Sequence, residues 1–276
     1  MRKPAGPTSH DVVDLVRRAL DTRRVGHLGT LDPFATGLLV VVVGRATRLA
    51  VYAAGWTKVY EGVIRLGMRT TTDDSTGAPA ETSERWRDLE PSQVAEALAR
   101  FRGVYDQQPP AFSAVHVAGE RAYRRARRGE AVALAPRRVE VAELELSRLA
   151  LPDVSFRAVV TGGTYLRGLA RDVGVALGCG AHLAALTRTE VGPFSLRDAV
   201  APSAVTAAGL LKPDVLVASL PRRDLDPTEA AGVLHGRPIE GGSADDSRVA
   251  LFGGGRLVAV GERVGAVIKP RVVLDP

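Results

Sequence analysis

Apolar positions recur along this chain in three patterns, each of which predicts a different kind of element. Spacings of three and four residues between apolar positions predict helices over 9–20 and 91–101. The first helix begins within the sequence Thr-Ser-His-Asp at 8–11, and the second begins at a proline. Alternating apolar and polar positions predict strands at 59–66, 139–149 and 154–160. The uninterrupted apolar run over 38–43 predicts one buried strand.

The pattern changes after about residue 211, where glycine becomes frequent and helix signals weaken. Short strands are expected there at 248–252, 257–260 and 266–268. This change predicts a small β-rich domain over 211–276 that follows a larger domain over 1–210. Two domains are a natural division for a chain of 276 residues.

Composition limits the class of protein. Hydrophobic residues make up 45% of the chain, as in an ordinary globular protein. The apolar run at 38–43 is far too short to cross a bilayer, and the N-terminus lacks the apolar segment of a signal peptide. Cys179 is the only cysteine, so no internal disulfide can form, and no Cys/His cluster has zinc spacing. We therefore expect a cytoplasmic protein without a metal site.

Charge is unevenly distributed along the chain, whose net charge is +6. Residues 121–138 contain seven arginines and one acid, whereas residues 73–96 contain seven acids and two arginines. A basic surface suits an acidic partner such as nucleic acid. The alternative interpretation is that the four arginines within 124–128 form the solvated side of one helix.

The stretch GHLGTLDPFATG at 26–37 surrounds a single carboxylate, Asp32, with three glycines and a proline. Pro33 restricts Asp32 to an extended or turn conformation, and the glycines permit close approach of the backbone. Such a loop can present a carboxylate rigidly to a ligand, although Asp-Pro is also a common start of an ordinary turn. His27 in the same stretch is a candidate wedge in RNA, a general base or a loop hydrogen-bond partner.

A second candidate is the stretch Gly-Thr-Tyr-Leu-Arg at 163–167. If this segment is a strand, Tyr165 and Arg167 share one face. An arginine beside a lone aspartate would keep it ionised and oriented, and a tyrosine could stack on a base. Tyr165 and Tyr60 are equally compatible with a place in the core. The sequence contains no P-loop, no dinucleotide-binding glycine motif and no zinc-protease motif.

Several short motifs follow one another in a specific order. They are Lys3-Pro-x-Gly6-x-Thr-Ser9-x-Asp11, Gly26-His27-x-Gly29-Thr30-Leu31-Asp32-Pro33-x-Ala35-Thr36-Gly37, Gly44-x-Ala46-Thr47, Lys58-x-Tyr60, Gln108-x-Pro110-x-x-Ser113-Ala114, Gly163-Thr164-Tyr165-x-Arg167 and Gly180-Ala181-His182-Leu183. Together they resemble the TruB family of bacterial tRNA pseudouridine synthases, which modify uridine 55 in the T-loop. The resemblance spans about residues 2–200, and the tail resembles more loosely the PUA-like RNA-binding domain of such enzymes.

The resemblance implies an α+β fold. A pseudouridine synthase catalytic core, with a mixed, largely antiparallel central sheet and flanking helices, would span 1–210 and include a basic RNA-gripping insert around 105–150. A small β-rich PUA-like RNA-binding domain would span 211–276. The implied activity is an isomerase without a cofactor, whose partner is the T-arm stem-loop of tRNA. We expect a monomer.

By the same resemblance, Asp32 is the essential catalytic carboxylate and Arg167 pairs with it. Tyr60 would stack on the target uracil, and its hydroxyl is a candidate base for proton removal. The residues that would bind substrate, as an RNA wedge, pocket walls and a supporting loop, are His27, Tyr165, Leu186, Lys3 and Pro4. The target uridine must be flipped out of the T-loop, at a cost of a few kcal/mol.

The sequence departs from the family pattern at His116, Phe112 and Thr187, where lysine, tyrosine and arginine are usual. These departures bear on RNA contacts and leave the proposed catalytic set intact. Two other functions are compatible with the motifs. One is a tRNA-folding chaperone that needs no chemistry, and the other is a guide-RNA-dependent relative that works inside a ribonucleoprotein.

Overall fold

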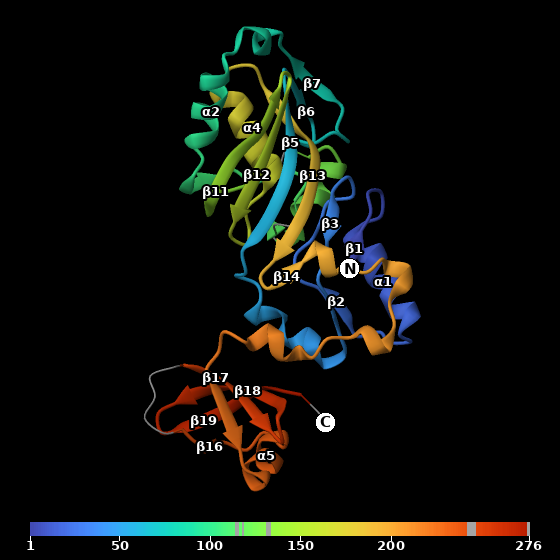
Figure 1. Ribbon diagram of the computed structural model, residues 1–276, viewed down its shortest axis with the longest axis vertical. Coiled ribbons are helices and arrows are strands. Elements are labelled where there is room, and N and C mark those ends of the chain that lie inside the picture. The colour runs from blue at the N-terminus through green and yellow to red at the C-terminus, as the bar shows by residue number, and fades with distance from the viewer. Residues whose placement is uncertain (114–115, 118, 131–133, 242–246, 275–276) are drawn as a thin grey trace. The chain divides into compact units, whose positions relative to one another are not determined.

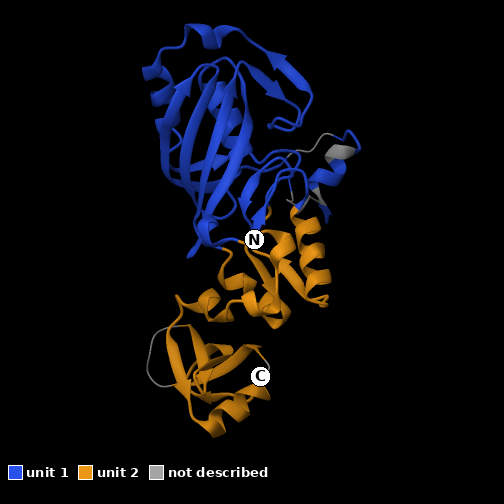
Figure 2. Ribbon diagram, turned by 45° about the vertical axis from the view of Figure 1, so that its right-hand side comes forward, with its two compact units in different colours: residues 1–8, 31–39, 55–199 blue, residues 9–30, 40–54, 200–276 orange. Residues whose placement is uncertain are grey.

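The computed structural model describes residues 1–113, 116–117, 119–130, 134–241 and 247–274 (Figure 1). The chain divides into two compact units, which Figure 2 distinguishes by colour. Unit 1 comprises Met1–Thr8, Leu31–Leu39 and Gly55–Ala199, and unit 2 comprises Ser9–Thr30, Val40–Ala54 and Val200–Pro276. No helix in the described ranges is both long and apolar enough to span a membrane.

Unit 1 is organised around one long sheet. Its strands follow the order β1 (Arg2–Lys3), β3 (Thr36–Leu38), β13 (Ala181–Val191), β5 (Lys58–Leu66), β12 (Asp153–Val160), β11 (Arg137–Ala150) and β8 (Gly103–Gln107), with β14 (Phe194–Ser195) beside β13. Neighbouring strands are antiparallel except β3 and β13, which are parallel. The expected mixed, largely antiparallel central sheet is confirmed.

Helices α4 (Leu166–Ala176) and α2 (Pro91–Ala99) cover one face of this sheet (Figure 1). The covered face is apolar, and Ile64 and Phe156 on it are almost completely buried. Burying one such side chain stabilises the fold by about 1.5–3 kcal/mol. This packing requires glycine at position 62, because a Cβ there would lie 2.7 Å from the Phe156 ring. The opposite face carries ion pairs such as Arg65–Asp153, with charged atoms 2.8 Å apart.

The remaining elements of unit 1 are short. They are β6 (Met68–Thr70), β7 (Pro79–Thr82), β9 (His116–Val117), β10 (Glu120–Arg121), the helix α3 (Ala122–Arg127) and the 3₁₀ helices η2 (Arg85–Asp88) and η3 (Leu196–Asp198). Strands β6 and β7 form one two-stranded sheet, and β9 and β10 form another. Helix α3 holds three of the four arginines within 124–128 and ends before Gly129. The φ of 77° at Gly129 suits a residue without a side chain.

The N-terminal part of unit 2 joins a helix to a small strand pair. Helix α1 (Ser9–Ala19) precedes β2 (Val25–His27), which pairs antiparallel with β4 (Val41–Val43). The 3₁₀ helix η1 (Gly44–Tyr52) follows β4 directly. Further 3₁₀ helices lie at η4 (Pro202–Ala204), η5 (Ala207–Gly209) and η6 (Pro213–Val217).

The C-terminal part of unit 2 is a second sheet. Its order is β15 (Arg222–Leu225), β17 (Arg248–Gly253), β18 (Arg256–Val264), β19 (Val267–Val273) and β16 (Ile239–Glu240). Helix α5 (Pro227–Leu234) contributes Val233 to the core of this sheet, beside Leu251 and Ile268. The Asp226 side chain caps α5 by accepting a hydrogen bond from the N–H of Glu229 at 2.8 Å.

Most expected elements are confirmed within a few residues, including the helices over 9–20 and 91–101 and the C-terminal strands. The single buried strand expected over 38–43 is wrong, because that run holds the end of β3 and all of β4, which belong to different sheets and different units. An uninterrupted apolar run has no period, so the sequence does not reveal the break. The domain boundary at residue 210 stays a prediction.

Candidate active site

The Asp32 carboxylate lies on a tightly anchored turn of unit 1. The flanking side chains of Leu31 and Ala35 are buried. The N–H of Ala35 donates to the Asp32 carbonyl at 3.1 Å, and the Pro33 carbonyl accepts from the N–H of Gly6 at 2.8 Å. With its backbone fixed in this way, the Asp32 side chain remains 33% exposed and can reach a ligand.

Lys3 holds the same turn through its ammonium group, although the residue is completely buried. The Nζ atom lies 3.0 Å from the carbonyl oxygen of Pro4, 3.1 Å from that of Asp32, 3.3 Å from that of Pro33 and 2.8 Å from that of Ala35. A buried charge is tolerated only with polar partners of this kind. The structure therefore places Lys3 and Pro4 at the backbone of the Asp32 turn, where Lys3 positions the turn.

Arg167 pairs with the Asp32 carboxylate through two parallel contacts. Its Nε donates to Oδ2 at 2.9 Å and its Nη2 to Oδ1 at 3.2 Å. The guanidinium also donates to the carbonyls of Thr72, at 3.0 Å, and Phe112, at 2.9 Å. Its side chain is only 6% exposed. A bidentate pair fixes the carboxylate in direction as well as in position. The structure thus brings together two residues that are 135 positions apart.

Tyr165 and Arg167 do not share the face of a strand, so that expectation is wrong. Tyr165 is the N-terminal cap of α4, and Arg167 lies in the first turn of the helix. The buried Gln107 holds the Tyr165 backbone, accepting from its N–H at 2.9 Å and donating to its carbonyl at 3.1 Å. The Tyr165 side chain packs against Ala122 and Leu134. The stretch 163–167 is too short to distinguish the two-residue period of a strand from the start of a helix.

Asp74 is a second carboxylate at Arg167 that the sequence analysis missed. Its Oδ2 lies 3.6 Å from the Arg167 Nε, and both side chains are 6% exposed. Its Oδ1 accepts hydrogen bonds from Thr72 Oγ1 at 2.7 Å, from Thr76 N at 2.9 Å and from Thr76 Oγ1 at 2.6 Å. The threonines therefore fix Asp74 so that its other oxygen faces the guanidinium. The acid-rich composition of residues 73–96 is typical of an exposed segment, so the sequence did not reveal this residue.

The first turns of α4 carry a further arginine that pairs with a carboxylate. Arg171 follows Arg167 by one turn, and its Nη1 lies 3.2 Å from the Asp73 Oδ2. Burial raises the pKa of Asp73 above its ordinary value, although Arg171 and Arg167 oppose this shift. Cations at a helix N-terminus are disfavoured by the helix dipole. Carboxylates beside these two arginines offset that cost.

Tyr60 and Leu186 lie on adjacent strands on the face that α4 covers. Arg188 on β13 is opposite Tyr60 on β5, and Leu186 is opposite Gly62. The Arg188 guanidinium is almost completely buried, and its Nη1 lies 3.4 Å from the Tyr60 hydroxyl. On its other side Arg188 is opposite Gly37 of β3, where a Cβ would clash with the Arg188 backbone. Strand β13 therefore connects the Asp32 turn to the strand that carries Tyr60.

Lys58 is a buried cation two residues before Tyr60. Its Nζ donates to the Trp56 carbonyl at 2.8 Å. Burial lowers the pKa of Lys58 to about 8, and the neighbouring charge of Arg188 adds to this effect.

The other candidate residues have separate surroundings. His27 is half-buried at the end of β2 and belongs to unit 2. Thr187, a departure from the family pattern, has its Oγ1 2.8 Å from that of Thr36. At Phe112 the contact with Arg167 uses the backbone carbonyl, so the missing tyrosine hydroxyl does not affect it. The side chain of His116 lies outside the described part of the structure.

The site therefore offers an oriented carboxylate, a buried guanidinium and a phenol on neighbouring elements. Such a set can supply a nucleophile and a proton acceptor. Among the described residues, no group of three or more His, Cys, Asp or Glu side chains could hold a metal ion.

Comparisons with known proteins identify the family of this chain. The family model described as "TruB family pseudouridylate synthase (N terminal domain)" matches residues 17–166, and "tRNA pseudouridylate synthase B C-terminal domain" matches 167–231. Two curated relatives are both named tRNA pseudouridine synthase B. The protein from Thermobifida fusca (strain YX) is 46% identical over 98% of this chain and 96% of its own. The protein from Mycobacterium sp. (strain KMS) is 43% identical over 99% of this chain and 94% of its own.

Solved structures show the same fold. A Cbf5–Nop10–Gar1 complex contains a chain that matches all of this chain and 84% of its own length at 25% identity, with a TM-score of 0.74. An archaeal box H/ACA sRNP Nop10–Cbf5 complex matches all of this chain and 85% of its own at 25% identity, with a TM-score of 0.70. From the matched family models and the near full-length similarity to curated relatives, this chain belongs to the TruB family of pseudouridylate synthases.

Proposed function

We propose that this protein is an isomerase that converts uridine 55 in the T-loop of tRNA to pseudouridine, acting as a monomer on the T-arm. The observation that carries the proposal is the bidentate pair of Asp32 and Arg167 in a TruB-family chain. The names of relatives at 43–46% identity support tRNA as the substrate.

The reaction needs no net oxidation and no co-substrate. The N1–C1′ bond of the uridine breaks, a C5–C1′ bond forms, the proton on C5 leaves, and N1 gains a proton. Asp32 is the proposed reacting group. Three routes are open to it: attack on C1′, attack on C6 of the base, or assistance of a glycal route. Each route needs a carboxylate held in a fixed direction, and the contacts with Arg167 and the Lys3-anchored turn support this.

Tyr60 is the proposed base for the C5 proton, and its ring is the proposed stacking surface for the uracil. Its place on the face covered by α4, the helix that carries Arg167, supports this role. Leu186 and Tyr165 are proposed as further walls of the uracil pocket. His27 is proposed to fill the space that the flipped uridine leaves in the RNA.

A guide-RNA-dependent enzyme is the second candidate function, because the similar solved structures come from complexes of Cbf5 with other proteins. A tRNA-folding chaperone is the third. A chaperone function alone does not explain the site. RNA phosphates repel a carboxylate, so RNA binding without chemistry gives no reason to hold Asp32 in place with a buried arginine.

The test is to incubate the protein with a T-arm stem-loop RNA, without any other protein or RNA, and to map pseudouridine by chemical probing. The Asp32→Asn variant runs in parallel, because it keeps the size of the side chain and removes its charge. Pseudouridine at the position of uridine 55 with the wild type, and none with Asp32→Asn, is the expected result.

Two results would contradict the proposal. Product that forms only after a guide RNA and partner proteins are added would favour the second candidate. RNA binding by both proteins without product from either, under all conditions, would favour the chaperone and withdraw the roles of Asp32, Tyr60 and Arg167.

A further inference from the structure

Gln107 is the last residue of β8, and its side chain reaches from the edge of the large sheet to the start of α4. The residue is almost completely buried. Its Oε1 accepts from the N–H of Tyr165 at 2.9 Å, and its Nε2 donates to the Tyr165 carbonyl at 3.1 Å and to the Tyr105 hydroxyl at 2.6 Å. The amide oxygen and both N–H groups of the amide therefore have partners, as a buried amide requires.

The backbone of Tyr165 determines the orientation of this amide. A rotated amide would set its NH₂ group against the Tyr165 N–H and its oxygen against the Tyr165 carbonyl, so only one orientation makes both bonds. Burial raises the pKa of Tyr105, so the phenol stays protonated at neutral pH and its oxygen accepts the third bond. The side chain of Gln107 is thus fixed relative to Tyr165.

Helix α4 leaves room for the Gln107 side chain through a glycine. A Cβ at Gly168 would lie 3.1 Å from the Gln107 Cδ and 3.2 Å from its Nε2, which is tighter than ordinary van der Waals contact. The Tyr165 carbonyl that Gln107 holds also accepts from the N–H of Leu169, at 3.0 Å. Gln107 therefore holds the residue from which the helix starts.

The start of α4 in turn places the arginine of the active site. Arg167 lies two residues after Tyr165, in the first turn of the helix. Its guanidinium donates to the Asp32 carboxylate and to the Phe112 carbonyl, and these bonds fix the far end of the side chain. The helix backbone fixes the near end. A displacement of the Tyr165 backbone therefore changes the direction from which Arg167 meets the carboxylate.

We propose that Gln107 is a positioning residue of the reaction: by fixing the backbone of Tyr165, it sets the place of Arg167 and thereby the direction of the Asp32 carboxylate. This role rests on the proposed function, since the reaction that it serves is the proposed isomerisation of uridine. Loss of the amide should slow the chemical step more than it weakens RNA binding. A displacement of about 1 Å in a supporting contact of this kind has an effect of about a hundredfold on rate.

The test replaces Gln107 with methionine, which has a similar size and no amide. The dissociation constant for a T-arm stem-loop RNA and the single-turnover rate of pseudouridine formation are measured on the same preparation, and a melting curve checks the folded fraction. We expect the rate to fall by about tenfold to a hundredfold and the dissociation constant to stay within about threefold of the wild type. A residue with only a structural role would lower the melting temperature and leave the rate of the folded protein unchanged.

A second variant, Gln107→Glu, guards against loss of folding, because it keeps the shape of the side chain and the acceptor for the Tyr165 N–H. A protonated carboxyl can donate to the Tyr165 carbonyl, whereas an ionised one cannot. The charged groups that act on Tyr105 beside this position are Asp172 and Arg171, and burial favours the protonated carboxyl. The rate of this variant relative to the wild type should therefore rise as the pH is lowered from about 8 to about 5.

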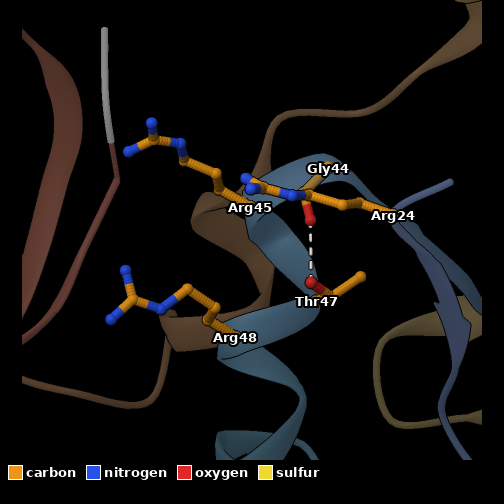
Figure 3. A pocket seen from close by; sticks show the side chains of 5 residues that line it. All are labelled: Arg24, Gly44, Arg45, Thr47 and Arg48. Carbon is orange, nitrogen blue, oxygen red and sulfur yellow. Dashed lines mark hydrogen bonds between the residues drawn. The ribbon is translucent and has the colours of Figure 1, made fainter. Parts of the chain in front are cut away.

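Two matched controls remove a hydrogen bond between a side chain and the backbone at the start of another helix. Gln93→Met removes the bond that Gln93 accepts from the N–H of Glu90 at the start of α2, at 2.8 Å. Thr47→Val removes the bond that the threonine hydroxyl donates to the Gly44 carbonyl at 2.7 Å, beside a pocket of unit 2 at the start of η1 (Figure 3). We expect both controls to keep the single-turnover rate within about threefold of the wild type.

A wild-type rate in folded Gln107→Met, or an equal loss of rate in the two controls, would overturn the proposal. A rate of Gln107→Glu that keeps a constant ratio to the wild type across this pH range would also overturn it. Each of these results leaves the proposed function intact if the wild type makes pseudouridine.

Crystal structures of the wild type and Gln107→Met give a readout that needs no activity. If the wild type makes no pseudouridine but the variant has lost the two-bond contact between Arg167 and Asp32, the proposed function fails and the positioning role of Gln107 in this pair stands. If the wild type makes no pseudouridine and the contact is unchanged in the variant, both fail.

Discussion

Replacing Lys3 with methionine removes the cation that holds the Asp32 turn while keeping a side chain of similar length. The Lys3 ammonium lies within 3.3 Å of four carbonyl oxygens, from Pro4, Asp32, Pro33 and Ala35. The thioether of methionine donates no hydrogen bond. Lys3→Met therefore leaves carbonyl groups in a buried place without their donor.

The size of the effect follows from these contacts. An ammonium has three N–H donors, so three of the four contacts can be good hydrogen bonds at one time. A buried acceptor left without a partner costs about 1–3 kcal/mol. The variant no longer pays the desolvation cost of a buried charge, and this offsets part of the destabilisation by the unpaired carbonyl groups. We expect a net loss of about 3 kcal/mol in the free energy of unfolding, which corresponds to a fall in Tm of about 6–12 °C.

The measurement is a urea titration of Lys3→Met, with RNA affinity and single-turnover pseudouridine formation recorded on the same preparation. We expect the rate to fall by about a hundredfold with little change in RNA affinity, because small displacements of a reacting group have effects of this size. Arg2→Met is the matched control, since Arg2 is the exposed neighbour on β1. A loss below about 1 kcal/mol with a wild-type rate would refute the reasoning.

Three further predictions concern the surroundings of this turn. Asp74→Asn removes a charge that faces Arg167 at 3.6 Å and should slow turnover about tenfold or more, with RNA affinity unchanged in a filter-binding assay. Tyr60→Phe should keep RNA binding and lose turnover, and normal turnover would remove the proposed role of the hydroxyl as a base. Lys58→Met tests the buried lysine whose pKa is about 8 when folded and ordinarily 10.5. The unfolded chain binds this proton more tightly, so the stability of the wild type relative to Lys58→Met should rise by about 3 kcal/mol as pH increases from 8 toward 10.5, measured by urea titrations. A pH-independent difference would contradict the assignment.

The pattern of apolar and polar positions predicted an element correctly where one face of that element is buried. The strand β5 alternates buried and exposed side chains over most of its length, and its bounds were expected within one residue. The run over 38–43 failed because an apolar segment without a period does not show where the chain changes sheets.

The residues of the site also divide into those that the sequence predicted and those that it did not. Asp32 and Arg167 were found through motifs, and their pairing across 135 positions is a tertiary contact that no local spacing encodes. Asp74 was missed because it lies in an acidic stretch with the composition of an exposed loop, yet its side chain is only 6% exposed. Arg188 was not predicted as part of the site. Its burial beside Tyr60 depends on the pairing of β13 with β5, which forms only in the folded chain.

The most direct test of the account is the loss of hydrogen from C5 of the target uridine. A T-arm RNA with tritium at C5 of its uridines is mixed with excess enzyme, and tritium released to water is followed in a single turnover. The account predicts release by the wild type and none by Asp32→Asn, whose affinity for the RNA should stay within about threefold. Release by Asp32→Asn within about tenfold of the wild-type rate would contradict the central role of Asp32.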